Sequence, residues 1–411
     1  MNHIKVKKYF FNFITIIVSS LLGLLIANFI LIKISNQKNF PRSLAGSLPN
    51  LLLTFYPDTY KKDSLSDYVA ILGDSYSQGG GEAYLNNEYN YSFGHHLFAN
   101  DSKNYLNFGR AGFGSISAIA NLIKINKLSN LPNLVPNLKK PKSIIFFFYE
   151  GNDLEDNIFE YNSFVKQKEN LRDFVNRRID EKIKLINVEK ITNIFPLFPF
   201  LNKLYNHLDN LVDKIFKSKD LNEIKLLTIK TIKKLFGYTV IISNEKNDFF
   251  KHTNSLKEHE NIKNIRPLQS AAADLSDKEI LISLEIFFNS IQYVKTWSQI
   301  NKIFIVYIPS PISSYLWNEP ITYVARNPNT GAFNKEIKTT TNIKNNLKSI
   351  FIRSEISNFS KINNIKFIDI TDFAVKAAVK NTLHGPLDWH HFNYNGYKST
   401  SNYISRNLEK N

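Results

Sequence analysis

The sequence contains no cysteine among its 411 residues. Disulfide bonds, thiolate nucleophiles and cysteine-based zinc or iron–sulfur sites are therefore excluded. The absence is compatible with an oxidising compartment but does not establish one. Whatever chemistry the chain performs, it does not depend on a thiol.

A dense run of lysine or arginine is also missing, although the chain is basic overall. The formal net charge is +16, a balance that can indicate nucleic acid, anionic lipid or an acidic polymer as a partner. The longest basic clusters, Lys5–Lys8 and Lys139–Lys142, are short, and no nucleic-acid-binding motif accompanies them. We therefore expect lysine-rich solvated surfaces and no nucleic-acid partner.

Long apolar runs are rare, and only residues 10–32 form one that is long enough to cross a membrane. This stretch has no charged residue, and a helix of that length spans a hydrocarbon core of about 30 Å. Lys5, Lys7 and Lys8 precede it, which by the positive-inside rule places the amino terminus in the cytoplasm. We expect a single-pass cell-membrane protein whose catalytic domain lies on the extracytoplasmic, periplasmic side. A cleaved signal peptide remains the alternative, although no clear cleavage site follows the run.

Shorter apolar runs alternate with helical segments through the rest of the chain. The expected strands are residues 68–72, 105–108, 143–149, 302–308 and 365–368. The expected helices are residues 91–100, 115–127, 278–300, 343–358 and 395–408. Short apolar runs bounded by glycine or proline are typical of buried parallel strands. Because helices separate these strands, the pattern predicts an α/β fold with a central parallel sheet.

The third and fourth expected strands are about 150 residues apart, far more than an ordinary crossover requires. We interpret residues 154–299 as a large, mostly helical insertion or lid. The flanking residues 68–153 and 300–408 belong to one sheet domain. Residues 1–34 would then form the cytoplasmic amino terminus and transmembrane anchor, and residues 35–67 a tether.

A serine directly follows the first expected strand, in the segment Gly73-Asp74-Ser75-Tyr76-Ser77. The carboxyl end of a parallel strand is where α/β sheets place ligands. A serine hydroxyl there is exposed and close to backbone N–H groups, and Gly73 permits the tight turn. Because Gly, Asp and Ser are also ordinary turn residues, the tripeptide alone is a weak signal.

Asp388 and His391 stand three positions apart near the carboxyl terminus, in the segment Asp388-Trp389-His390-His391. On a turn of this spacing the carboxylate can accept a hydrogen bond from one imidazole nitrogen. The other nitrogen is then left to take a proton from a serine, for which histidine has a suitable ordinary pKa. A solvated turn is the alternative interpretation.

Two further segments follow the next expected strands: Asn107–Gly112 after the second and Gly151–Asp153 after the third. With the serine segment and Asp388–Asn393, they form four blocks that resemble those of the SGNH (GDSL) hydrolase family, in the family's order. Agreement among four individually weak motifs makes a strong prediction. The resemblance covers the sheet domain and carries no information on the insertion or the tether.

The resemblance implies a three-layer sandwich around the parallel sheet, similar to flavodoxin, and acyl transfer through a serine. Ser75 would be the nucleophile, His391 the general base and Asp388 the group that orients the imidazole. The oxyanion hole would consist of the Ser75 and Gly112 backbone N–H groups and the Asn152 side-chain amide.

Three more residues, Tyr315, Trp317 and His390, are candidates for substrate binding. The family's Asp-x-x-His-x-Asn spacing selects His391 as the base, which leaves the adjacent His390 on the substrate side or in packing. Tyr315 and Trp317 follow the fourth expected strand and could line an acyl or sugar pocket. Ordinary aromatic packing is the alternative for both.

We expect neither a metal nor another cofactor. Three histidines lie near the carboxyl terminus, but they lack the spacing of known zinc motifs. The glycine run 79–81 has no P-loop pattern and is interpreted as a flexible loop beside the active site. Asp74 and Asp153 are expected to order loops, since the triad already has its carboxylate.

The motifs leave three functions open. The first is a serine esterase that acts on O-acyl esters of an envelope glycan or lipid. The second is an O-acyltransferase that modifies an exported polysaccharide through the same acyl-enzyme. The third is a catalytically silent glycan-binding module. The expected partner is an ester-bearing carbohydrate or lipid, whereas the sequence predicts neither the acyl group nor an oligomeric state.

Overall fold

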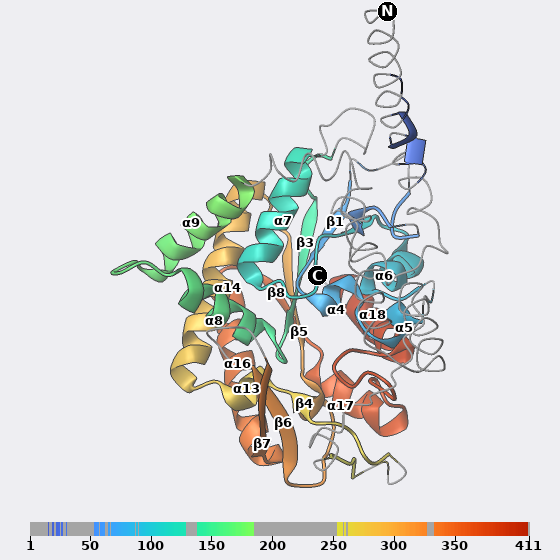
Figure 1. The fold of residues 1–411 in the computed structure, drawn as a ribbon, viewed down its shortest axis with the longest axis vertical. Coiled ribbons are helices and arrows are strands. Elements are labelled where there is room, and N and C mark those ends of the chain that lie inside the picture. The colour runs from blue at the N-terminus through green and yellow to red at the C-terminus, as the bar shows by residue number, and fades with distance from the viewer. Residues whose placement is uncertain are drawn as a thin grey trace, which may run out of the picture. The chain divides into compact units, whose positions relative to one another are not determined.

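A computed structural model describes four stretches of the chain. They are residues 53–128, 138–184, 253–326 and 333–409, apart from positions 57, 62–64, 66, 87, 89, 258, 260 and 261, with a few isolated residues between 15 and 30. The chain divides into two compact units, and the one formed by Thr54–Ile186 and Ile241–Asn411 contains all the strands and helices below (Figure 1).

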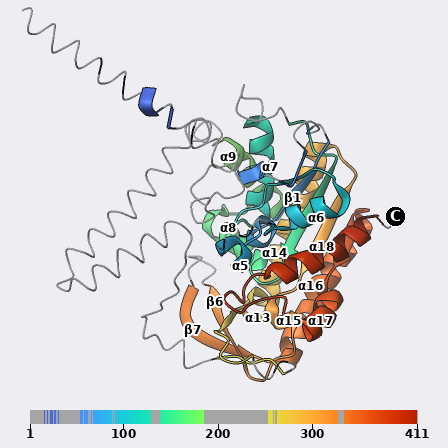
Figure 2. The same cartoon turned by 90° about the vertical axis from the view of Figure 1, so that its right-hand side faces the viewer.

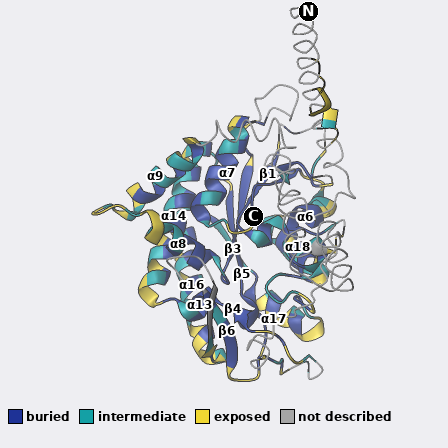
Figure 3. Cartoon of the chain, in the orientation of Figure 1, coloured by how far each residue is buried: buried dark blue, intermediate teal, exposed yellow. Residues whose placement is uncertain are grey.

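Five parallel strands form the central sheet, in the order β2-β1-β3-β5-β8. They are β1 (Val69–Leu72), β2 (Tyr105–Asn107), β3 (Ser143–Tyr149), β5 (Ile303–Ile308) and β8 (Lys366–Asp369). Every residue of the first four is buried, whereas the edge strand β8 is mostly half-buried (Figure 3). Continuous apolar runs suit strands that are covered on both faces. The expected parallel sheet is thus confirmed.

Successive phenylalanines of β3 show how helices cover both faces of the sheet. Phe147 stacks on Phe93 of α6 (Phe93–Asp101), with ring centroids 4.3 Å apart. Its neighbours Phe146 and Phe148 point the other way and contact Phe287 of α14 (Asp277–Ser298), with centroids 5.0 and 4.8 Å apart. Side chains alternate along a strand, so each face of the sheet packs against its own helical layer.

The long helices of the two layers lie close to their expected positions. They are α6 (Phe93–Asp101), α7 (Ser115–Leu128), α14 (Asp277–Ser298), α16 (Asn342–Ile362) and α18 (Tyr394–Glu409). Helix α14 packs against α7 and α16, while α6 packs against α18 on the other layer (Figure 2). Helix α14 begins with a capping box between Ser276 and Glu279, which satisfies backbone N–H groups at its start.

The described part of the insertion is largely helical. It contains α8 (Asp153–Phe164), α9 (Leu171–Lys184), α13 (Ala271–Asp274) and α14. Both α8 and α9 pack against α14, and α9 also packs against α7. These helices therefore extend the layer on one face of the sheet. Residues 185–252 of the insertion lie outside the described residues.

A second, three-stranded sheet was not anticipated from the sequence. Its strands are β4 (Leu268–Gln269), β6 (Ile321–Arg326) and β7 (Phe333–Thr340), in the order β4-β6-β7. Strand β7 reads FNKEIKTT, which lacks the apolar run that marks a buried strand. The remaining short helices are α4 (Ser75–Gln78), α5 (Glu82–Leu85), α15 (Pro311–Ser314) and α17 (Thr371–Lys380).

The structure gives no information on the expected anchor. Residues 10–32 lie mostly outside the described part of the chain. Among the residues that are described, no helix combines the length and the apolar character needed to cross a membrane.

Candidate active site

Ser75 lies at a tight turn between β1 and α4. Gly73 adopts a φ of +137°, and a Cβ there would lie 2.7 Å from the carbonyl oxygen of Phe147. The Asp74 side chain caps α4 by accepting from the Tyr76 N–H. Ser75 is the first residue of α4, so its own N–H has no acceptor within the helix. The turn therefore presents the hydroxyl together with an unused backbone donor.

His391 lies between Ser75 and Asp388. Its Nε2 is 2.9 Å from Ser75 Oγ, and its Nδ1 is 2.8 Å from Asp388 Oδ2. The first of these contacts joins residues that are 316 positions apart in the sequence. The structure thus brings the three predicted triad residues into one continuous chain of hydrogen bonds.

The charges around the triad favour a protonated His391 imidazole next to an ionised Asp388 carboxylate. Burial alone would lower the pKa of His391, but the hydrogen bond and charge of Asp388, with the charge of Asp74, raise it above its ordinary value. Burial alone would raise the pKa of Asp388, but its hydrogen bond and the charge of His391 hold it well below the usual range. Asp388 can therefore stabilise the imidazolium that forms when His391 takes a proton.

Glu82, which the sequence reasoning missed, holds the loop that carries Asp388. Its Oε1 accepts from the backbone N–H groups of Leu387 and Asp388. The Asp388 carboxylate in turn accepts from the His390 N–H at 2.8 Å through its other oxygen. Glu82 thus holds the backbone at Asp388, and the His390 N–H holds its carboxylate. No sequence spacing signals the bonds from Glu82, because Glu82 and Asp388 are 306 positions apart.

The glycine run is packed against the catalytic imidazole. A Cβ at Gly80 would lie 3.1 Å from His391 Cδ2 and 3.2 Å from its Nε2. At Gly81, with φ +122°, a Cβ would lie 2.6 Å from the carbonyl oxygen of Phe392. The Tyr397 hydroxyl donates to the Gly80 carbonyl at 2.7 Å. The glycine run does lie beside the site, as expected, and its backbone packs closely against the side chain of His391.

The order β2-β1-β3 places the Ser75 strand between the strands that precede Gly112 and Asn152. The loop after β2 is tied to the Ser75 turn, since the Arg110 N–H donates to the Gly73 carbonyl at 3.3 Å. Gly112 is exposed and has a φ of +73°. The carboxyl ends of adjacent parallel strands share one edge of the sheet, so Gly112 and Asn152 lie in loops that leave the same edge as the Ser75 turn.

Asp74 connects the Ser75 turn to Asn152. Burial raises the pKa of Asp74 to about 6, against the lowering effects of His391, the Tyr76 N–H and a hydrogen bond from the Asn152 side chain. The Asn152 amide thus donates to the carboxylate beside the nucleophile. Asp74 Oδ2 is also 3.2 Å from Ser75 Oγ. These contacts agree with the expected loop-ordering role of Asp74.

Asp153 orders the next loop in a similar way. Its Oδ2 accepts from the Tyr149 N–H at 2.8 Å, which closes the turn after β3. Burial, followed by the charge of Asp74, raises its pKa well above the ordinary value. The preceding Glu150 is fully buried and accepts hydrogen bonds from four hydroxyl groups. The donors are Tyr307, Ser310, Ser313 and Ser349.

The side chains of Tyr315 and Trp317 are packed inside the protein. Their side chains are 6% and 0% exposed, within a cluster beside the second sheet. The Trp317 indole N–H donates to the Pro311 carbonyl at 3.1 Å. These contacts favour the packing alternative for both residues, and their substrate role stays a prediction. His390 is half-buried and holds the loop through its backbone.

The Tyr315 hydroxyl fixes the tautomer of His384. Its oxygen accepts from the Leu383 and His384 N–H groups, at 2.8 and 3.0 Å. Its single proton is left for His384 Nδ1, 3.0 Å away. His384 therefore carries its proton on Nε2, 3.0 Å from the Tyr76 hydroxyl. Burial lowers the pKa of His384 to about 3, so the ring is neutral.

This chain of hydrogen bonds continues to the catalytic loop. Tyr76 accepts from His384 and is hydrogen-bonded to Tyr149. The Tyr149 hydroxyl donates to the His390 carbonyl at 3.2 Å, so its oxygen accepts the Tyr76 proton. Each hydroxyl thus has one donor and one acceptor role. This chain of hydrogen bonds therefore ends at His390, the residue that precedes the catalytic His391.

Among the described residues, no group of three or more His, Asp or Glu side chains is arranged to hold a metal ion. No family model matches the chain, and searches of curated proteins and of solved structures found no match. The assignment of a function therefore depends on the residues themselves.

Proposed function

We propose that this protein is a membrane-anchored serine esterase of the SGNH type, acting on O-acyl esters of an envelope glycan or lipid. The observation that carries the proposal is the continuous chain Ser75–His391–Asp388, with contacts of 2.9 and 2.8 Å. A serine next to a histidine oriented by a carboxylate is the arrangement that activates a hydroxyl for acyl transfer.

The first half of the reaction forms an acyl-enzyme. Ser75 Oγ attacks the ester carbonyl while His391 Nε2 takes its proton, and Asp388 stabilises the resulting imidazolium. The negative oxygen of the tetrahedral intermediate is held by the Ser75 and Gly112 N–H groups and the Asn152 amide. Such donors typically contribute about 3–4 kcal/mol each in the transition state. His391 then gives its proton to the leaving alcohol.

In the second half, water attacks the acyl group and His391 acts as the base again. The protonated His391 then returns the proton to Ser75 as the acid is released. A sugar hydroxyl in place of water would make the same acyl-enzyme a transferase. The triad and the motif resemblance support both ester hydrolysis and acyl transfer. An experiment must decide whether water or a sugar hydroxyl accepts the acyl group.

The test is hydrolysis of short-chain aryl esters and acetylated glycans by the purified full chain. We expect Ser75→Ala to lower kcat by at least about 10⁴-fold. Ser354, an exposed serine of α16, provides a matched control, and Ser354→Ala is expected to keep full activity. Unchanged hydrolysis by Ser75→Ala would refute the proposal. Acyl groups that move to an added acceptor sugar, instead of appearing as free acid, would identify a transferase.

A further inference from the structure

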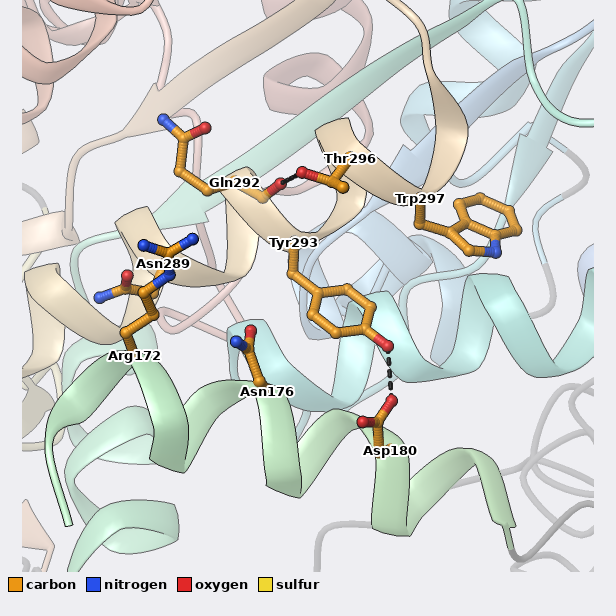
Figure 4. A pocket seen from close by; sticks show the side chains of 8 residues that line it. All are labelled: Arg172, Asn176, Asp180, Asn289, Gln292, Tyr293, Thr296 and Trp297. Carbon is orange, nitrogen blue, oxygen red and sulfur yellow. Dashed lines mark hydrogen bonds between the residues drawn. The ribbon is translucent and has the colours of Figure 1, made fainter.

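A pocket of about 440 Å³ lies on the helical layer between α9 and α14, apart from the catalytic loops. All of its lining residues belong to these two helices, with Arg172, Asn176 and Asp180 on α9 (Figure 4). None of them belongs to the loops that hold Ser75, Asp388 or His391. The volume lies within the range of about 300–1,000 Å³ that small-molecule sites occupy.

The lining of this pocket has an unusual composition, because none of its side chains is aliphatic. Amides come from Asn176 and Asn289, and aromatic rings from Tyr293 and Trp297. Because Asn289 Nδ2 already donates to the carbonyl and the carboxylate of Glu285, at 2.8 and 3.1 Å, only its Oδ1 is left for a ligand. The lining therefore offers an acyl chain no aliphatic side chain to pack against. A sugar offers hydroxyl groups that amides can both donate to and accept from, and flat C–H faces that pack on aromatic rings.

Arg172 differs from the other arginines of α9. Arg177 and Arg178 are held by carboxylates, at 2.7 Å from Glu169 and 2.8 Å from Glu160. Arg172 is exposed and has no hydrogen-bond or ion-pair partner within the described part of the chain. A guanidinium binds a carboxylate through two parallel hydrogen bonds, so Arg172 is available for an acidic ligand.

The other charged residue of the lining is already engaged. Asp180 Oδ1 accepts from the Tyr293 hydroxyl at 2.6 Å (Figure 4). This bond holds the Tyr293 ring between the two helices. At the Trp297 end, Lys140 lies 5.5 Å from the centre of the indole ring and donates to the Trp297 carbonyl. A second cation thus stands beside the pocket.

We propose that this pocket binds a short acidic oligosaccharide, with a uronate carboxylate on Arg172 and sugar hydroxyls on the Asn176 amide and on Oδ1 of Asn289. A sugar face would pack on Tyr293. The pocket would keep an acidic polysaccharide on the protein while Ser75 acts on an ester elsewhere along the same polymer. This assignment rests on the proposed function for its choice of substrate class and narrows that class to anionic glycans.

The test is calorimetric titration of the full chain, at one low salt concentration, with tetragalacturonate and with the neutral tetrasaccharide of galactose. We expect Arg172→Gln to raise the Kd for tetragalacturonate about tenfold and to leave binding of the neutral sugar unchanged. Asn176→Leu should weaken both sugars. Lys184→Gln removes an equal charge from an exposed position of α9 outside the pocket and should change the Kd less than twofold.

Three results would overturn the pocket assignment. They are a wild-type chain that binds neither sugar, an equal loss in Lys184→Gln, and inorganic polyphosphate that binds as tightly through Arg172 as tetragalacturonate does. Aryl-ester hydrolysis, measured on the same samples, separates this proposal from the proposed function. Arg172→Gln should keep that activity, and Ser75→Ala should keep the sugar binding while losing hydrolysis.

Discussion

Two histidines of the carboxyl-terminal loop, His384 and His391, are seven positions apart and lie in opposite environments. His391 contacts the carboxylate of Asp388, which raises its pKa against the effect of burial. The two ring nitrogens of His384 lie against the hydroxyls of Tyr76 and Tyr315, and burial lowers its pKa to about 3. His384 is fully buried and His391 is half-buried. Burial by itself lowers the pKa of both rings, so the hydrogen-bond partner decides which one can carry a proton.

This difference separates a reactive histidine from a structural one. A carboxylate stabilises the imidazolium, whereas hydroxyl groups do not compensate for its lost hydration. His391 can therefore take and return a proton during catalysis. His384 stays neutral and acts as a fixed link in the hydrogen-bond chain that ends on the His390 carbonyl. Four predictions test whether His391 alone is reactive and His384 is structural.

The largest effect is expected when His391 loses its carboxylate. Asp388→Asn should lower kcat for aryl-ester hydrolysis by about 10⁴-fold, because the amide neither stabilises the imidazolium nor enforces the right tautomer. Asp372 is an exposed aspartate of α17, and Asp372→Asn should be fully active. A loss of less than tenfold in Asp388→Asn would show that His391 works without its partner.

The pH dependence of kcat/KM should report on His391 alone. The base must be unprotonated to accept the Ser75 proton, so activity should fall about tenfold per pH unit below the pKa of His391. Because that pKa is raised, the acidic limb should lie above the ordinary histidine value of about 6.5. An acidic limb below this value, or one that shifts in His384→Gln, would contradict the assignment of the titrating group to His391.

A smaller effect is expected where the two environments are connected. Tyr149→Phe removes the donor to the His390 carbonyl and should lower kcat about tenfold with little change in KM, since the loop before His391 loses a fixed contact. Tyr403 has no hydroxyl partner within the described residues, and Tyr403→Phe is the control. Equal activities of the two variants would leave the hydrogen-bond chain with no part in positioning His391.

The smallest effect on activity is expected at His384 itself. His384→Gln leaves buried hydroxyls short of partners and should lower the free energy of unfolding by about 1–3 kcal/mol, measured by urea denaturation. The rate should fall less than fivefold. A stable variant that has lost most of its activity would show that His384 takes part in the chemistry.

Much of the sheet was predictable, since buried parallel strands need continuous apolar runs and turn signals at their ends. The run SIIFFFY at 143–149 matches β3 residue for residue. Strand β7 was missed because its largely polar sequence, FNKEIKTT, resembles a loop. It forms a strand by pairing with β6, and no local pattern in the sequence predicts that pairing.

The triad residues were predictable because each lies in a short block directly after a strand or within a turn. The residues that hold them were not. Glu82 contacts Asp388 across 306 positions, and Tyr149 contacts His390 across 241. Such contacts depend on the packing of whole layers. Tyr315 looked like a pocket residue by its position after β5, but only the packed structure reveals that its hydroxyl has two backbone donors.

The most direct measurement is labelling of the full chain with a fluorophosphonate, followed by mass spectrometry of the modified peptide. If His391 activates Ser75, the adduct should form on Ser75 in the wild type and in His384→Gln. It should be at least a hundredfold slower to form in His391→Ala. Labelling of another serine, or equal rates on Ser75 with and without His391, would contradict the account.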